Sequence, residues 1–388
     1  MDKIRQESLK GELILLRRYF HRYPELGFQE KNTKLIIEGY LLKFLSLENL
    51  RVFAETGVSA VLKGKEGKTI LLRADMDALP IQEENDVPYR SKIDGVMHAC
   101  GHDGHMAMLM VAAKILSRHR EELKGNVKFV FQPSEEKLPG GAKIMIEQGV
   151  LGNPKPDMAF ALHLSTDAPV GTIGLKSGPI LAFCDGFEMT VIGKGGHVAF
   201  PHQAVDAIEI CGHILDAWKT ILTREISPME PVVIQIGIFK GGTASNVIAE
   251  KVEIRGTVRA SNSQLRGFIA ERMKMMAVGI AKAMRAEAAF NYYEGYPALI
   301  NDGTAIDFVS FVAGEIKNFK IVETKPEMGG EDFAYFLQQI PGCLAWLGAA
   351  NNEKGLNAPH HSSRFNFDED ALLLGTEVLV KTVLEYLK

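Results

Sequence analysis

The sequence has few cysteines, no long apolar run and no excess of charge of either sign. Its four cysteines are too few and too scattered over 388 residues for a disulfide framework, which favours a reducing compartment. No apolar run approaches the ~18 residues that a membrane span requires, and the first residues lack the apolar core of a signal peptide. We therefore expect a soluble cytoplasmic protein that binds no membrane.

The charge balance excludes a further class of partner. The net charge is −4, and no run of lysines and arginines provides the basic field that nucleic acid requires. A hydrophobic content of 46% and a charged content of 24% are typical of a globular protein. A chain of 388 residues exceeds the ~250–300 residues at which a single core stops growing. We therefore expect two domains.

The first part of the chain alternates strands with helices. The apolar strand-like runs are 69–73, 127–131 and 158–162, and the helical patterns between them are 104–117 and 141–148. Strands that are apolar throughout and alternate with helices indicate a mostly parallel sheet covered on both faces. The same alternation resumes beyond residue 295. The sequence thus predicts one α/β catalytic domain built from residues 1–180 and 295–388.

The middle of the chain follows another pattern. Strands at 187–192, 232–239, 252–258 and 287–293 are interrupted by helices at 204–222 and 264–283. The order β-α-β-β-α-β is that of the ferredoxin-like arrangement, and its neighbouring termini suit insertion into a host domain. We predict an inserted domain over residues 181–294.

Residues 98–105, which read HACGHDGH, concentrate donors of the kind that bind metals. Cys100 and His102 can both face one ion only if the backbone between them is irregular, and Gly101 permits that. The alternative is an ordinary buried cysteine beside a histidine-rich helix start. The density of histidine and cysteine favours metal binding.

Polar side chains follow three of the predicted strands. Asp75 and Asp77 follow the first strand, Glu135 and Glu136 the second, and His163 the third. Because ligand sites of open α/β sheets lie beyond the carboxyl ends of the strands, we expect these groups at one edge. A Glu-Glu pair alone is also typical of a solvated helix start. The coincidence of three strand ends is what indicates a site.

The donors are dispersed and mixed in type, which favours a catalytic site over a structural zinc site. The candidate ligands are Cys100, His102, Glu136, His163 and a histidine at 360 or 361. These are too many for one ion with an open position, whereas two ions about 3.5–4 Å apart would use them all. Glu135, beside a ligating carboxylate, is then available to take a proton from a bridging water.

Three motifs carry a resemblance to a known family. RADMDALP at 73–80, HACGHDGH at 98–105 and QPSEE at 132–136 are similar to those of the dinuclear-metal aminoacylase/carboxypeptidase family. The branch resembled is that of hippurate hydrolase, N-acyl-amino-acid amidohydrolases and auxin-conjugate hydrolases. The resemblance implies a zinc-peptidase-like catalytic domain with an inserted ferredoxin-like dimerisation/lid domain. A departure, Lys-Leu-Pro at 137–139 in place of a glycine-rich run, bears on the acyl preference.

The resemblance also implies roles for individual residues. The implied ligands of two divalent cations are Cys100, His102, Glu136, His163 and His361, with Cys100 as a bridge. Glu135 would be the general base, Asp77 would orient a ligand, and His197 would polarise the scissile carbonyl across a dimer. Asn246 and Arg259 would hold the substrate's free carboxylate, although Arg259 also reads as an ordinary charge at a strand end.

The implied activity is hydrolysis of N-acyl amino acids or C-terminal peptide bonds by a metal-bridging hydroxide. Zinc is favoured by a thiolate among imidazoles and carboxylates, while cobalt or manganese can fill such a site. The expected partners are a small-molecule substrate and further copies of the chain, in a homodimer or higher homo-oligomer. The alternatives are a dipeptidase or aminopeptidase, a non-catalytic binding protein for amino-acid conjugates, and a hydrolase with Cys100 as nucleophile and His102 as base.

Overall fold

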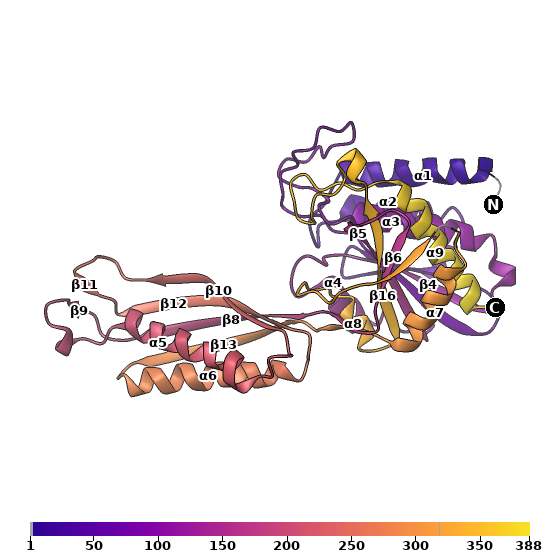
Figure 1. Ribbon diagram of the computed structural model, residues 1–388. Coiled ribbons are helices and arrows are strands. Elements are labelled where there is room, and N and C mark those ends of the chain that lie inside the picture. The colour runs from indigo at the N-terminus through magenta and orange to yellow at the C-terminus, as the bar shows by residue number, and fades with distance from the viewer. Residues whose placement is uncertain (1–2, 318) are drawn as a thin grey trace. The chain divides into compact units, whose positions relative to one another are not determined.

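The computed structural model describes residues 3–317 and 319–388 and separates into two compact units (Figure 1). The large unit comprises Met1–Gly178, Ile300–Lys325 and Asp332–Lys388, and the small unit comprises Pro179–Leu299 and Pro326–Glu331. Among the described residues, no helix combines the length and the apolar character needed to cross a membrane.

The large unit contains an eight-stranded sheet. Its strands are β1 (Leu50–Phe53), β2 (Gly57–Lys63), β3 (Lys68–Asp75), β4 (Gly125–Gln132), β5 (Met158–Pro169), β6 (Thr172–Leu175), β15 (Lys320–Glu323) and β16 (Gly342–Ala350). The order is β1-β2-β4-β3-β5-β16-β6-β15. The central strands β4, β3, β5 and β16 are parallel, whereas β1 and β2 are antiparallel additions at one edge. The predicted fold class, an α/β protein with a mostly parallel sheet, is confirmed.

The large unit also contains helices, most of which pack against this sheet. They are α1 (Lys3–Arg22), α2 (Lys31–Leu41), α3 (His102–Ser117), α4 (Gly141–Glu147), α7 (Gly303–Gly314), α8 (Ala334–Leu337) and α9 (Asp370–Tyr386). The helix α3 contacts β3 on one side and both α1 and α9 on others. Because it is covered on several sides, α3 is apolar around almost its whole circumference, as a fully buried helix must be.

The strands β3 and β4 end level with each other at the edge where the motifs lie. The interior of β3 is fully buried at Ile70, Leu71 and Leu72, as expected for a strand covered on both faces. Asp75, the last residue of β3, pairs with Gln132, the last residue of β4. The sheet thereby places the residues after both strands at a common edge.

The small unit contains a four-stranded antiparallel sheet. Its strands are β8 (Phe183–Ile192), β10 (Val232–Gly241), β12 (Lys251–Ala260) and β13 (Glu287–Tyr296), in the order β10-β12-β8-β13. The helices α5 (Ala207–Thr220) and α6 (Leu265–Ala283) pack on each other and on this sheet (Figure 1). Their contact buries Trp218, whose indole N–H donates to the Met273 carbonyl at 3.0 Å. The chain order β-α-β-β-α-β is the predicted one.

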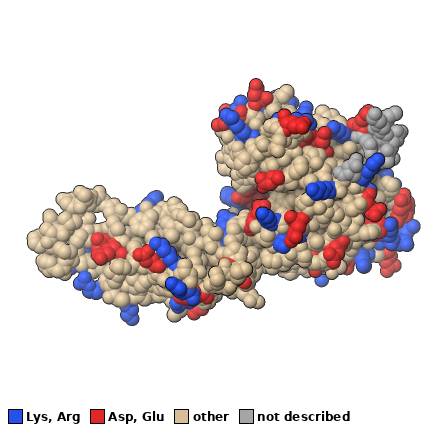
Figure 2. Space-filling view, viewed as in Figure 1, with Lys and Arg blue, Asp and Glu red and all other residues tan. Residues whose placement is uncertain are grey.

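Four short strands complete the fold. They are β7 (Gly178–Leu181), β9 (Gly196–His197), β11 (Val247–Ile248) and β14 (Leu299–Asn301), and they form the pairs β11-β9 and β14-β7. The segment 326–331 belongs to the small unit because Glu327 N–H donates to the Ile180 carbonyl and Ala182 N–H to the Gly329 carbonyl. On the visible face of each unit, basic and acidic side chains are interspersed (Figure 2).

Candidate metal centre

The loop that ends at α3 presents a thiol and an imidazole to the same point. Gly101 has a φ of 93°, in the left-handed region that favours glycine, and this bend brings Cys100 and His102 to one side. Ligand-type atoms of Cys100, His102 and Glu136 lie within 4.8 Å of one another. The Sγ of Cys100 is also 3.6 Å from the Nε2 of His163. Donors from three separate parts of the chain, one of them the strand β5, therefore converge.

The hydrogen bonds of two histidines leave one ring nitrogen directed at this point. The Nδ1 of His102 lies 2.8 Å from the Asp77 carbonyl, and the Nδ1 of His163 lies 2.8 Å from the Leu164 carbonyl. Since a carbonyl only accepts, both Nδ1 atoms carry a hydrogen, which leaves each Nε2 as the metal-binding atom. The Nε2 of His102 is buried and has no hydrogen-bond partner.

The electrostatics of the site favour added positive charge. Burial lowers the pKa of His102, but Asp75 and Asp77 outweigh it and raise that pKa to about 10. Burial, followed by the charges of Glu136 and Glu135, raises the pKa of the Cys100 thiol well above its ordinary value. A thiolate there requires a compensating cation, so this donor set fits divalent metal ions.

Asp77 organises the loop that carries the two glutamates. Its side chain is buried, with an exposed fraction of 1%. Its Oδ1 accepts the Glu135 N–H at 3.0 Å and its Oδ2 accepts the Glu136 N–H at 2.9 Å. The carboxylate of Asp77 thus fixes two consecutive peptides, and the backbone carbonyl of Asp77 orients His102 as well.

The adjacent histidines 360 and 361 have different surroundings. The Nε2 of His361 lies 3.0 Å from the Glu136 Oε1, and its backbone N–H donates to the Ala99 carbonyl at 2.8 Å. This hydrogen bond with Glu136 raises the pKa of His361. His360 instead stacks on Trp346, with ring centroids 6.5 Å apart and an interplanar angle of 22°. His361 therefore reaches the proposed ligand Glu136 through a ring nitrogen, whereas the ring of His360 lies edge-on to that of His163, with centroids 5.3 Å apart.

His105 is a site residue that the sequence prediction missed. Its Nδ1 donates to the Asp75 Oδ1 at 2.6 Å, and its Nε2 accepts the Leu164 N–H at 2.9 Å. Both nitrogens are therefore occupied, and His105 supports the site without binding a metal. The available signal was its spacing of three residues from His102, which places both on one face of α3.

A buried arginine stabilises the Asp75 carboxylate. The Nη1 of Arg73 donates to the Asp75 Oδ2 at 2.7 Å, and its Nη2 donates to the Asp332 Oδ1 at 3.0 Å. Burial opposes ionisation of Asp75, but the charges of His102, Arg73 and His105 lower its pKa well below the ordinary value. Asp75 is therefore a permanent negative charge behind the ligands.

The other predicted residues lie in the small unit. His197 in β9 pairs with Val247 in β11, and both line a shallow pocket with Asn246. The Nδ1 of His197 accepts the Ala199 N–H at 3.1 Å, so its Nε2 carries a hydrogen that it can donate. Arg259 is not among the residues that line this pocket. It lies in β12.

Arg259 is held by contacts within the small unit. Its Nη1 donates to the Cys184 Sγ at 2.8 Å and to the Met328 carbonyl at 3.0 Å. Cys184 is also its partner in the register of β12 and β8. The guanidinium therefore has a fixed orientation at the end of the strand.

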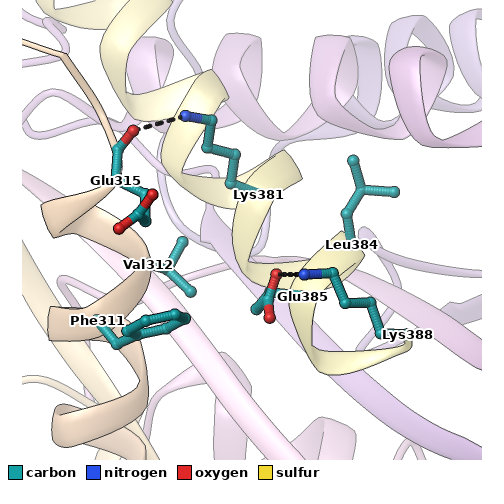
Figure 3. Close-up of a pocket in the computed structure, with 7 residues that line it drawn as sticks. All are labelled: Phe311, Val312, Glu315, Lys381, Leu384, Glu385 and Lys388. Carbon is teal, nitrogen blue, oxygen red and sulfur yellow. Dashed lines mark hydrogen bonds and ion pairs between the residues drawn. The ribbon is translucent and has the colours of Figure 1, made fainter.

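A groove on the large unit, between α7 and α9, has a different chemistry (Figure 3). Lys381 donates to the Glu315 carbonyl at 3.2 Å, and Lys388 forms an ion pair with Glu385. The remaining lining residues are Phe311, Val312 and Leu384. Its lining provides no thiol or imidazole.

Comparison with known proteins places these residues in context. Residues 71–385 match the family model for peptidase family M20/M25/M40. An N-acetylcysteine deacetylase of Bacillus subtilis is 40% identical over 390 residues, which cover 98% of this chain and 99% of that protein. Thermostable carboxypeptidase 1 of Saccharolobus solfataricus is 39% identical over 380 residues, which cover 97% and 96% of the two chains.

A solved structure is similar over the whole chain. The YXEP protein of Bacillus subtilis, described as a dinuclear metal binding peptidase from the M20 family, has a TM-score of 0.85 and 35% sequence identity. The match covers 98% of this chain and 99% of that one. The similarity therefore extends over both units.

Proposed function

The chain belongs to peptidase family M20/M25/M40 and is a hydrolase of amide or peptide bonds, and from this premise we propose a two-cation mechanism for it. The proposed ligands are Cys100, His102, Glu136, His163 and His361. The observation that carries this proposal is the convergence of Cys100, His102 and Glu136, whose donor atoms lie within 4.8 Å of one another. The contact of His361 with Glu136 at 3.0 Å and of His163 with Cys100 at 3.6 Å extends the set to five.

The residues of the chain then divide the chemistry among them. Two cations bound at this centre supply the charge that acidifies water and polarises the scissile carbonyl. Glu135 takes a proton from the attacking water and returns it to the departing nitrogen. The Nε2–H of His197 donates to the oxygen on which negative charge develops. Asp77 fixes the position of the Glu135 loop relative to His102, because it binds both.

The substrate class follows from what the relatives' activities share. Deacetylation of N-acetylcysteine and carboxypeptidase cleavage both release an amino acid whose own carboxylate is free. We assign Asn246 and Arg259 to that carboxylate. Arg259 lies at the end of β12 remote from Asn246, so two copies of the chain in the proposed homodimer would supply the two side chains. The contacts of Arg259 with Cys184 and Met328 support this role, because recognition of a planar carboxylate requires an oriented guanidinium.

The proposal extends to metal, assembly and location. Zinc is the proposed metal, since a thiolate among imidazoles and carboxylates suits it, with cobalt or manganese as substitutes. The inserted domain, residues 181–294, would serve as a dimerisation and lid domain in a homodimer or larger assembly. The protein would act in the cytoplasm on a small-molecule substrate.

Metal analysis combined with a substrate panel tests this function. We expect two divalent cations per chain, hydrolysis of N-acetyl, N-benzoyl or N-benzyloxycarbonyl amino acids, and loss of activity on chelation that added zinc, cobalt or manganese restores. Preference for unblocked dipeptides would instead favour a dipeptidase. Chelator-resistant activity that alkylation of Cys100 abolishes would contradict the metal mechanism.

A further inference from the structure

Glu30 is a buried carboxylate that the proposed chemistry does not use. It precedes α2, and its exposed fraction is 0%. Its Oε1 accepts the Ser134 N–H at 2.9 Å, and its Oε2 accepts the Thr56 hydroxyl at 2.7 Å. A glutamate is rarely buried to this degree unless both oxygens are engaged. Its hydrogen bond to Ser134 indicates that it holds the Ser134 peptide in place.

Ser134 begins a run of three peptides held by two carboxylates. Glu30 accepts the Ser134 N–H, and Asp77 accepts the next two N–H groups, those of Glu135 and Glu136. Ser134 has a φ of 50°, a conformation that residues other than glycine rarely adopt. Such a backbone persists only where the surrounding contacts hold it. The peptide immediately before the general base is therefore kept in an uncommon conformation, and Glu30 binds its N–H.

The loop that carries Glu30 fits closely against this run. A Cβ at Gly27 would lie 2.6 Å from the Ser134 Oγ, so only glycine permits the observed approach. The Ala78 N–H donates to the Glu25 carbonyl at 2.8 Å, next to Asp77 in the chain. One N-terminal loop thus contacts both the glutamate loop and the segment of the aspartate that organises it.

We propose that Glu30 is a positioning residue for catalysis, which fixes the peptide before Glu135 so that the base is aligned for proton transfer. It acts through Ser134, without touching substrate. This inference rests on the proposed function, because Glu135 must be the base for its alignment to matter. Burial and then the charge of Asp77 raise the pKa of Glu30 to about 7, and the protonated carboxyl still offers an oxygen to the Ser134 N–H. The acceptor oxygen, and not the charge, is the required feature.

Substitutions that separate the acceptor from the charge test this role. Glu30→Gln keeps an acceptor oxygen, and we expect kcat within about threefold of wild type. Glu30→Met has similar volume without an acceptor, and we expect kcat to fall about 10–100-fold with KM changed less than about twofold, as for a misaligned base. Glu30→Asp keeps the carboxyl group but shortens the side chain by one methylene, so its kcat should also fall. This variant provides the test if Glu30→Met folds poorly.

The matched control is Thr56→Val. It removes the other hydrogen bond of Glu30 but leaves the bond to Ser134, so kcat should stay near wild type even if the melting temperature falls. Each variant is assayed for bound cations and for cooperative unfolding. Full kcat in both Glu30→Met and Glu30→Asp, an equal loss in Glu30→Gln, or loss of cations in step with kcat would overturn the positioning role. Failure of wild-type protein to hydrolyse N-acyl amino acids with its cations bound would overturn the proposed function instead.

Discussion

Most functional residues of the large unit are buried, with His361 an exposed exception, whereas two of those in the small unit are exposed. In the large unit, Asp75, Asp77 and His102 have exposed fractions of 0%, 1% and 0%. In the small unit, His197 and Asn246 are exposed on the ribbon formed by β9 and β11. Groups that are buried and cross-linked are aligned before substrate arrives, whereas groups on an exposed ribbon gain a partner only on binding. Substitutions in the two units should therefore differ in their effects on catalytic rate and on stability.

The sheet of the small unit nevertheless contains a buried, hydrogen-bonded cluster around Asp185. Asp185 has an exposed fraction of 2% and accepts hydrogen bonds from Arg266 Nη2 at 2.6 Å, Tyr292 Oη at 2.8 Å and the Gly295 N–H at 2.8 Å. This cluster ties β8 to α6 and β13. The exposed ribbon is thus an extension of a well-packed sheet, in keeping with binding loops carried on a stable scaffold.

The largest effect is expected for Glu135→Gln in the large unit. The substitution removes the proton acceptor but keeps the size of the side chain, so kcat should fall about 10²–10⁴-fold. Bound metal should remain at two cations per chain, because Glu135 is not a proposed ligand. Kinetics with an N-acyl amino acid and metal analysis check both expectations. More than a few per cent of wild-type turnover would remove Glu135 from its role.

A smaller effect that separates function from stability is expected for His197→Ala. Loss of a donor to the developing oxyanion should lower kcat about 10²-fold. Because His197 is exposed, the free energy of unfolding should change by less than about 0.5 kcal/mol. The control is His213→Ala, another exposed histidine of the small unit, which should leave both quantities unchanged. A loss of stability that matches the loss of rate would erase the contrast between the units.

The smallest effect concerns a buried charge of the large unit outside the site. Lys128 is 2% exposed, its Nζ donates to the Val150 and Gly152 carbonyls at 2.7 and 2.6 Å, and burial lowers its pKa to about 8. Between about pH 8 and its ordinary pKa of 10.5, the unfolded chain binds more protons than the folded one, so stability rises with pH.

Denaturant titrations of wild type and Lys128→Met at pH 8 and pH 10 measure this contribution. Wild type should gain about 1 kcal/mol or more relative to the variant over that interval. Lys240→Met, at an exposed lysine of the small unit, is the control and should show a constant difference of less than about 0.5 kcal/mol. If the free energy of unfolding changed with pH equally in wild type and Lys128→Met, the lowered pKa of the buried Lys128 amine would be contradicted.

Periodicity predicted the main elements because most are long and apolar. It located the helix now seen as α3 and the β-α-β-β-α-β order of the small unit, and the fold class is confirmed. It did not reveal that β1 and β2 are antiparallel, because an apolar run carries no direction. The two-residue strands β9 and β11 are too short for any period, so the ribbon that carries His197 was not predicted.

The motifs predicted the family, which the comparisons confirm. They did not reveal contacts made by residues far apart in the chain. Glu30 reaches Ser134 across 104 positions, and Arg73 reaches Asp332 across 259. Nothing local marks such residues as parts of a site, since each reads as an ordinary charge in a helix start or strand. The assigned roles of the individual ligands remain predictions.

The segment 326–331 has a consequence for dissecting the molecule. The chain passes between the units four times, after residues 178, 299, 325 and 331. A contiguous fragment that ends at residue 299 would lack the Met328 carbonyl that accepts from Arg259 and the Glu327 backbone that pairs with Leu181. Excision of the small unit as one piece would therefore remove one of the two acceptors of Arg259 and the bridge partner of Leu181, and a faithful graft needs a covalently joined second peptide.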